Sequence, residues 1–268
     1  MHNSGYLMEN ADEALRLDVK IEDRKIEQQA KWAGIKPGMR VADLGCGPGR
    51  ITSLLHNMVG PGGEVVGVDG SGERIAYAGN KYGGSGIEFV VRDLTRPLED
   101  LGMFDFIWVR FVLEYHLAGS FDLVRNFSRS LKPGGILCLS DLDHNPFVCY
   151  GAPPRLDRTF SRVMRELEEK HDFDPFVGRK LYSFLYDLGL DDIAVQVEIY
   201  KIFYGEMSDG DVYNILKKIE VAPKRINFDF NEYAGGFEEF YAEAKVFFSD
   251  PRRFAYAPLI TCRGKKKG

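Results

Sequence analysis

Short apolar runs alternate with stretches of helical periodicity in the first half of the chain. The apolar runs predict β-strands at residues 39–44, 64–69, 87–92, 104–110 and 136–140. Between them, hydrophobic residues recur at helical spacing and predict helices at residues 12–33, 51–58, 71–81 and 121–131. Strands that are joined through helices run parallel, with right-handed crossovers. Because the strands are apolar almost throughout, we expect helices on both faces of the sheet.

The second half of the chain is less regular and richer in helical pattern. It predicts helices at residues 154–170, 181–188, 212–219 and 237–248. Looser alternation predicts strands at residues 193–203 and 254–262. No repeat or interdomain linker separates the halves, so the extra helices are expected to cap one domain. That domain, residues 1–268, is divided into an N-terminal helical segment (1–34), a core (35–141), cap helices (142–190) and C-terminal strands with inserted helices (191–268).

Three glycines at alternate positions separate the first predicted strand from the helix that follows it. The sequence there is Asp43-Leu-Gly-Cys-Gly-Pro-Gly49. Glycine lets the backbone approach a ligand closely, and the N–H groups that begin the helix would face that ligand. A dinucleotide-binding loop of the form G-x-G-x-x-G would need its third glycine where Arg50 stands. The spacing therefore argues against a nicotinamide dinucleotide as the ligand.

Composition narrows the class of protein further. The chain has 268 residues, of which 44% are hydrophobic and 28% charged, as in an ordinary globular protein. Its net charge of −5 argues against nucleic acid as a partner, although charge alone leaves an acidic RNA-modifying enzyme open. Four cysteines without C-x-x-C spacing predict no zinc site and a reducing compartment. We see no secretion signal and no run long enough to span a membrane, so we expect a cytoplasmic protein.

The D-x-G-x-G-x-G pattern that begins at Asp43 resembles motif I of the class I S-adenosylmethionine-dependent methyltransferases. The resemblance extends over about residues 38–141, because Asp69 closes the second strand and Asp93 follows the third. Residues 131–135, Leu-Lys-Pro-Gly-Gly, match the turn before the family's fifth strand. The chain is most similar to the small-molecule group that includes ubiquinone-biosynthesis-type enzymes. We therefore expect a Rossmann-like, doubly wound, mostly parallel sheet of seven strands, with an antiparallel last strand and a helical cap.

The resemblance implies S-adenosylmethionine as the methyl donor and S-adenosylhomocysteine as the product. It places the glycine loop against the methionine part, Asp69 on the ribose hydroxyls, and Asp93 near the adenine. A backbone carbonyl at Arg110 or Phe111 would meet the ammonium group. The cofactor-binding residues expected on these grounds are Tyr6, Arg16, Asp43, Gly45, Cys46, Gly47, Asp69, Gly70, Asp93, Leu94, Arg110 and Phe111.

Two of these residues belong to the N-terminus. Tyr6-Leu7, followed by Glu13 and Arg16-Leu17, resembles the entry segment of some small-molecule methyltransferases. In those enzymes a tyrosine and the first helix close over the cofactor, so residues 1–34 are expected to act as a lid. An exposed tail with a packed tyrosine is the alternative.

The acceptor side is less well defined, because methyl transfer mainly needs alignment of the reacting atoms. A base is needed only when the acceptor atom carries a proton. Polar clusters after the fourth and fifth strands contain Glu114, Tyr115, His116, Asp141, Asp143, His144 and Tyr150. His116 and His144 are the candidate bases, although either can have a structural role. Asp141, Asp143 and Asn145 fit a solvated loop better than a magnesium site, so no metal is expected.

We therefore predict methyl transfer to a small acceptor by in-line displacement. Aromatic residues at 145–188 and 208–250 favour an apolar or aromatic acceptor, although most of them are expected in the core. The alternatives are an RNA or protein methyltransferase and a non-catalytic, cofactor-binding regulatory protein. An NAD-dependent oxidoreductase is opposed by Arg50. The sequence leaves the methylated atom and the oligomeric state open.

Overall fold

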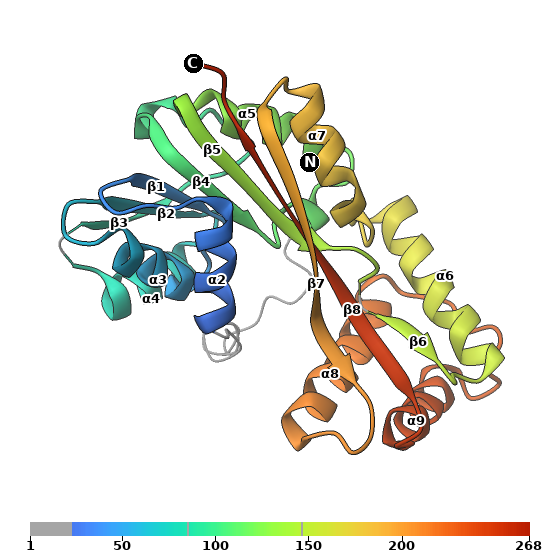
Figure 1. The fold of residues 1–268 in the computed structure, drawn as a ribbon. Coiled ribbons are helices and arrows are strands. Elements are labelled where there is room, and N and C mark those ends of the chain that lie inside the picture. Colours follow the sequence, from blue (N-terminus) through green and yellow to red (C-terminus); the bar gives the residue numbers. More distant parts are fainter. Residues whose placement is uncertain (1–22, 85, 146) are drawn as a thin grey trace.

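The computed structural model describes residues 23–84, 86–145 and 147–268, and Figure 1 shows how their helices and strands are arranged. The strands are β1 Arg40–Leu44, β2 Glu64–Asp69, β3 Ile87–Val91, β4 Phe104–Arg110, β5 Leu131–Leu142, β6 Val148–Tyr150, β7 Asp191–Phe203 and β8 Phe254–Lys265. The helices are α2 Asp23–Ala33, α3 Arg50–Val59, α4 Gly72–Tyr82, α5 Ser120–Arg129, α6 Pro154–Lys170, α7 Leu181–Asp187, α8 Asp209–Arg225 and α9 Gly236–Ser249. Short 3₁₀ turns lie at Glu99–Leu101, Leu113–Tyr115 and Val177–Lys180.

The strands form an eight-stranded sheet in the order β3-β2-β1-β4-β5-β8-β6, and β7, which lies off this path, also pairs with β8. Strands β1 to β5 pair in parallel, whereas β8 runs antiparallel to each of its neighbours. This confirms the predicted Rossmann-like, mostly parallel sheet with an antiparallel last strand, although the sheet has eight strands instead of the predicted seven. None of the helices in the described part of the chain is both long and apolar enough to cross a membrane.

Two local features differ from the sequence prediction. The short strand β6 was not predicted, because three residues carry no readable alternation; it pairs with β8 at Phe254–Tyr256. The segment 132–135, predicted as a turn, belongs to β5 instead. The Gly134 N–H donates to the Lys266 carbonyl at 2.9 Å, and the Lys266 N–H donates to the Gly135 carbonyl at 2.8 Å. Pairing with the end of the chain thus extends β5 through a glycine-rich irregularity.

Helices cover both faces of the central strands, as the apolar strands predicted. Val41, Phe106 and Trp108 belong to a buried cluster that α2 and α3 cover. Their neighbours along the strands, such as Leu44 and Ile107, point to the opposite face, where α5 and α7 cover them. Side chains alternate along a strand, so consecutive residues pack against helices on opposite faces of the sheet.

The helices α6, α8 and α9 form a cap near β6 and the adjacent end of β8 (Figure 1). Their shared core is rich in aromatic rings, among them Phe147, Phe160, Phe240 and Phe248. Several of these rings meet edge to face, for example Phe160 and Phe240, with ring centroids 6.0 Å apart. Edge-to-face contacts of this kind stabilise the core beyond the burial of apolar surface and favour one arrangement of the rings. Of the helices predicted in the cap segment 142–190, α6 lies in this cap, whereas α7 packs on the sheet; α8 and α9 come from the segment 191–268.

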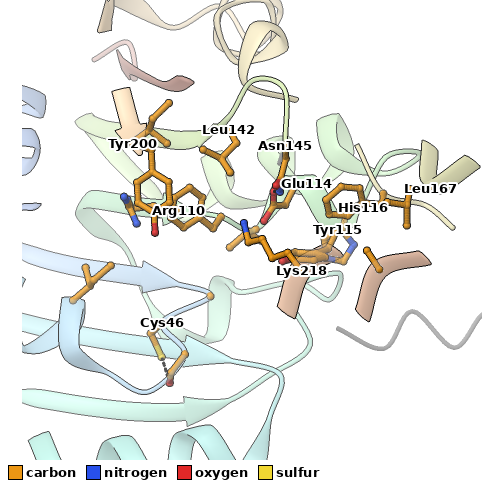
Figure 2. Close-up of a pocket in the computed structure, with 18 of the residues that line it drawn as sticks. Cys46, Arg110, Glu114, Tyr115, His116, Leu142, Asn145, Leu167, Tyr200 and Lys218 are labelled. Atoms are coloured by element: carbon orange, nitrogen blue, oxygen red, sulfur yellow. Dashed lines mark hydrogen bonds between the residues drawn. The ribbon is translucent and has the colours of Figure 1, made fainter. Parts of the chain in front are cut away.

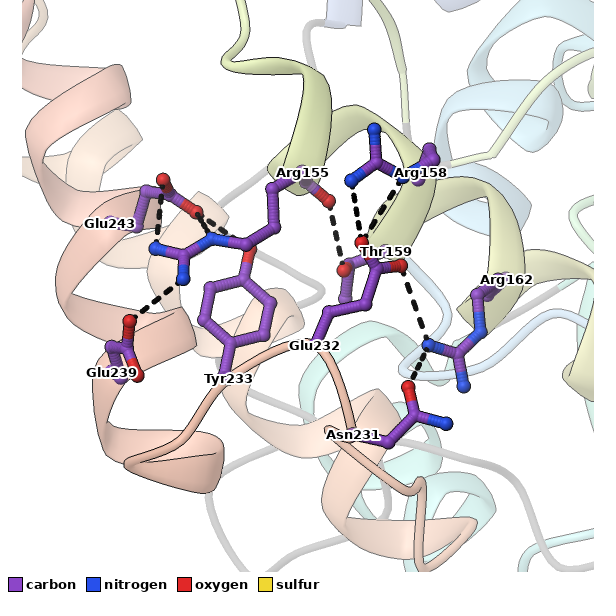
Figure 3. Close-up of polar contacts among 9 residues, drawn as sticks. All are labelled: Arg155, Arg158, Thr159, Arg162, Asn231, Glu232, Tyr233, Glu239 and Glu243. Carbon is purple, nitrogen blue, oxygen red and sulfur yellow. Dashed lines mark hydrogen bonds and ion pairs between the residues drawn. The ribbon is translucent and has the colours of Figure 1, made fainter.

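Ion pairs fasten α6 to α9 and to the loop before α9 (Figure 3). The Arg155 guanidinium lies 2.8 Å from a carboxylate oxygen of Glu239 and 3.2 Å from one of Glu243. One turn further along α6, Arg158 contacts Glu232 at 2.6 Å. Each pair is partly exposed and worth little alone. Together they fix the orientation of α6, which forms one wall of the cavity described below.

The close approach of α3 to its neighbours yields a prediction about Gly49. Gly49 has a φ of 84°, and a Cβ there would lie 2.7 Å from the Cβ of Ala78. We expect Gly49→Ala to lower the free energy of unfolding by about 2 kcal/mol or more, through overpacking and backbone strain. Gly62→Ala is the matched control, because a Cβ at Gly62 would meet no neighbouring atom within 4 Å. Urea unfolding would measure both variants, and equal midpoints would contradict the packing described here.

Candidate cofactor and acceptor cavity

A cavity of about 770 Å³ lies at the carboxyl ends of the central strands, between the sheet and the cap helices. Its size is within the range of small-molecule sites, and ligands of open α/β sheets bind at this edge. One part is lined by the glycine loop and the ends of β2 and β3, and another by α6 and α8. Figure 2 shows the polar residues that face the cavity from the end of β4 and from β7.

The glycine loop forms one side of the cavity with its backbone. Gly45, Gly47 and Gly49 have φ values of 80°, 55° and 84°, a region that other residues rarely adopt. The Gly45 N–H donates to the Val68 carbonyl at 2.7 Å, which ties the loop to β2. A Cβ on Gly45 would lie 2.3 Å from Cγ2 of Val112. Gly45 and Gly49 thus require glycine, as predicted, because both have a positive φ and because a Cβ at either position would clash.

Asp69 ends β2 beside this loop, and its side chain is buried. Its Oδ2 accepts from the Gly47 N–H at 2.9 Å, while its Oδ1 accepts from the Ser71 N–H at 2.8 Å. Arg74 forms an ion pair with Oδ1 at 3.0 Å. Because a carboxylate oxygen has two lone pairs, Oδ2 can accept a ligand hydroxyl beside the Gly47 N–H. The carboxylate is therefore held in place and still able to bind a ligand.

The other residues predicted near the adenosine lie along the same side. Gly70, Asp93 and Leu94 line the cavity. Asp93 is exposed and accepts from the Thr95 hydroxyl at 2.6 Å, and this bond lowers the pKa of the Asp93 carboxyl. Cys46 also lines the cavity, but burial raises the pKa of its thiol well above the ordinary value. A packing role suits Cys46 better than a reactive one.

Asp43 does not line the cavity but lies behind the loop. Its carboxylate accepts from the Thr52 hydroxyl at 2.7 Å. Burial raises the pKa of Asp43 to about 7. Tyr6 and Arg16, the predicted lid residues, lie outside the described residues.

Arg110 and Phe111 line the cavity at the end of β4. The Arg110 guanidinium stacks on the Phe111 ring at 4.0 Å and lies 5.5 Å from the centre of the Tyr200 ring. Its Nε is buried and has no hydrogen-bond partner among the described residues. The resemblance suggested only a backbone contact at this position, so the orientation of the side chain was not predicted.

Two buried carboxyl groups, Glu114 and Asp141, lie near the ends of β4 and β5. Glu114 lines the cavity, and its Oε2 accepts from the Asn145 side-chain amide at 2.7 Å. Asp141, from the adjacent strand β5, accepts from the Leu113 N–H at 3.0 Å. Burial, with the neighbouring Glu114, raises the pKa of Asp141 well above its ordinary value. Repulsion between the two carboxylates therefore favours the protonated form of Asp141.

The structure separates the two predicted bases. His116 lines the cavity, and burial lowers the pKa of its imidazole, so it is neutral and able to accept a proton near pH 7. His144 is not among the described residues that line the cavity; its ring meets Phe176 edge to face, with centroids 5.5 Å apart. The nearby Asp143 pairs with Arg179 at 2.7 Å. No cluster of three His, Cys, Asp or Glu side chains suited to a metal ion occurs in residues 23–84, 86–145 and 147–268.

The far wall of the cavity comes from the cap and is mostly apolar, with Lys218 of α8 as a charged exception. It is lined by Phe160, Val163, Met164, Leu167, Phe173, Ile219, Ala222, Pro223 and Phe240. Other aromatic residues proposed from the sequence lie elsewhere: Tyr150 is 76% exposed, and Tyr182 and Tyr186 stack on each other at the surface. Helical periodicity places an aromatic ring on a face but does not say whether a cavity or the core lies there.

Comparison with known proteins identifies the core of this fold. Residues 42–139 match the family described as a methyltransferase domain. The 2-phytyl-1,4-naphtoquinone methyltransferase of Synechococcus elongatus is 33% identical over 120 residues, which are 44% of this chain and 51% of that protein. An uncharacterized 37.1 kDa protein in transposon TN4556 of Streptomyces fradiae is 28% identical over 189 residues, 70% of this chain and 53% of that protein. The chain spans about half the length of these curated relatives.

Solved structures agree on the fold. Phosphoethanolamine N-methyltransferase 2 of Haemonchus contortus, in complex with phosphomonomethylethanolamine and S-adenosylhomocysteine, superposes with a TM-score of 0.54 at 18% identity. The match covers 91% of this chain and 53% of that one. Residues 42–139 thus match a methyltransferase domain, and the predicted resemblance to the class I S-adenosylmethionine-dependent methyltransferases is confirmed.

The raised pKa of Asp43 leads to a prediction about pH and stability. In the unfolded chain this carboxyl titrates near 3.8, and in the folded protein near 7. The folded state therefore binds more protons across this window, so the contribution of Asp43 to stability falls as the pH rises through it. Asp43→Asn keeps an oxygen for Thr52 but cannot ionise. Relative to this variant, the free energy of unfolding of the wild type should fall by up to about 4 kcal/mol between pH 4 and pH 8. Urea unfolding at several pH values measures the difference, and parallel curves would exclude it.

Proposed function

We propose that this protein is an S-adenosylmethionine-dependent methyltransferase that acts on a small molecule. The proposal rests on one observation: two different surfaces line the same cavity. The glycine loop and Asp69 line one side, and an apolar wall with Glu114 and His116 lines the other. The match of residues 42–139 to a methyltransferase domain supports the same conclusion.

The residues on the loop side fit the proposed donor. Gly45 lies so close to Val112 that there is no room for a side chain. The loop would therefore contact the methionine part of the donor with its backbone. Asp69 would accept bonds from the ribose hydroxyls through Oδ2, and Asp93 with Leu94 would contact the adenine. The bound cofactor supplies an activated methyl group on a sulfonium, which leaves alignment and exclusion of water to the protein.

The protein's own contribution to chemistry would come from the groups that face the acceptor. The Glu114 carboxylate, held by Asn145 and next to Asp141, and the neutral His116 imidazole are two proton acceptors in the cavity. Either would take the proton from an acceptor O–H, N–H or C–H group as the new bond to carbon forms. We infer that His116, together with Glu114, holds this role rather than His144, because His116 and Glu114 line the cavity.

The apolar wall favours an acceptor with a hydrophobic or aromatic part. Phe160, Met164 and Leu167 of α6 would contact that part and keep water out. The relative named as a 2-phytyl-1,4-naphtoquinone methyltransferase has an acceptor with such a part, which supports this assignment. A polar group of the acceptor would then lie near Glu114 and His116.

Calorimetric titration with S-adenosylmethionine, S-adenosylhomocysteine and NAD tests the proposal. The wild type should bind the two adenosyl ligands and not NAD. Asp69→Ala should weaken their binding about tenfold or more, because it removes a charged acceptor from the ribose hydroxyls. Asp122→Ala is the matched control, since Asp122 is an exposed acid on α5 that pairs with Arg125. Binding of NAD alone, or equal affinity in the Asp69 variant, would reject the proposed site.

A further inference from the structure

Among the described residues, the Arg110 side chain has no hydrogen-bond or ion-pair partner, and it lies next to the cavity. Its Nε is fully buried. Its contacts are the faces of Phe111 and Tyr200. Figure 2 shows Arg110 beside Tyr200. Buried charges are normally paired, so an unpaired one at a cavity calls for an explanation.

Strand alternation explains which way the side chain points. Phe106 and Trp108, four and two residues earlier on β4, pack on the face covered by α2 and α3. Arg110 continues that face where the strand ends, and Gln29 of α2 lines the cavity on the same side. The guanidinium is therefore held at the boundary between the sheet and the open cavity.

The carboxylates that influence Arg110 have other partners. Glu198 accepts from the Gln29 side-chain amide at 3.0 Å. Asp141 is bonded to backbone N–H groups, and Asp43 is bonded to Thr52. These acids influence the pKa of Arg110, which burial lowers, but none of them forms an ion pair with it. No described carboxylate therefore occupies the edge of the guanidinium, which leaves it open to an anion bound in the cavity.

The shape of the group identifies the ligand chemistry. A guanidinium offers parallel N–H donors that match the two oxygens of a carboxylate. Stacking on Phe111 fixes its plane and leaves the edge available to such a partner. Resting on the proposed function, we propose that Arg110 is a carboxylate-binding residue that holds a carboxylate of a molecule bound in the cavity. That carboxylate belongs either to the amino-acid part of the donor or to the acceptor.

Binding measurements with matched pairs of probes separate these two sources. The first pair is S-adenosylhomocysteine and 5′-methylthioadenosine, which share the adenosine thioether but differ in the amino-acid part. The second pair is benzoate and benzamide, titrated in the presence of S-adenosylhomocysteine. Each probe is measured by calorimetry against the wild type, Arg110→Met and Arg110→Lys. Arg125→Met, an exposed arginine on α5, is the control variant.

Arg110→Met should fold, because methionine removes an unpaired buried charge at little loss of volume. Thermal unfolding checks this, and the midpoint should equal or exceed that of the wild type. Arg110→Lys keeps the charge but not the planar pair of donors, so its affinities should lie between those of the other two proteins.

If the donor supplies the carboxylate, Arg110→Met should lower the affinity for S-adenosylhomocysteine about tenfold or more and leave the affinity for 5′-methylthioadenosine unchanged. If the acceptor supplies it, the variant should bind S-adenosylhomocysteine normally and lose benzoate but not benzamide. Equal weakening of both adenosine ligands, or no effect on either carboxylate, would overturn the proposal. Failure of the wild type to bind any adenosyl ligand would instead reject the proposed function; the benzoate pair, titrated without that ligand, would still decide the role of Arg110.

Discussion

The geometry of the site depends on one steric constraint. The loop after β1 is packed tightly between β2 and the segment that follows β4. Gly45 is bonded to the Val68 carbonyl on one side and lies against Val112 on the other. A side chain has no room there, so the backbone itself becomes the surface of the cavity. The same packing sets Asp69 beside Gly47 and brings Arg110 and Glu114 to the opposite side of the cavity.

The cavity thereby combines two environments that come from different parts of the sequence. The loop side is polar and is built from backbone N–H groups and the acids at strand ends. The cap side is apolar, and ion pairs of Arg155 and Arg158 hold its helix α6 in position. A methyl donor with a polar body and an acceptor with a hydrophobic part would each meet a suitable surface. Alignment of the two is the main task that the proposed chemistry sets for the protein.

Local sequence was enough to predict the strands of the core, the glycine loop and the acids that follow β2 and β3, because each depends on short-range periodicity or on backbone conformation. Strand β6 and the extension of β5 were missed, since both exist through pairing with β8, more than a hundred residues away. The distinction between His116 and His144 also required tertiary structure. Glu114 and Asp141 were recognised as candidates, but their adjacency follows from the pairing of β4 with β5.

The central claim is that adenosyl ligands bind between the glycine loop and Asp69, with the sulfur directed toward the cap. A crystal structure with S-adenosylhomocysteine bound tests this most directly. We expect the ribose hydroxyls within hydrogen-bond distance of Asp69, the adenine beside Leu94, and the sulfur facing the part of the cavity that contains Glu114 and His116. Binding of the ligand elsewhere, or with the ribose away from Asp69, would contradict the account.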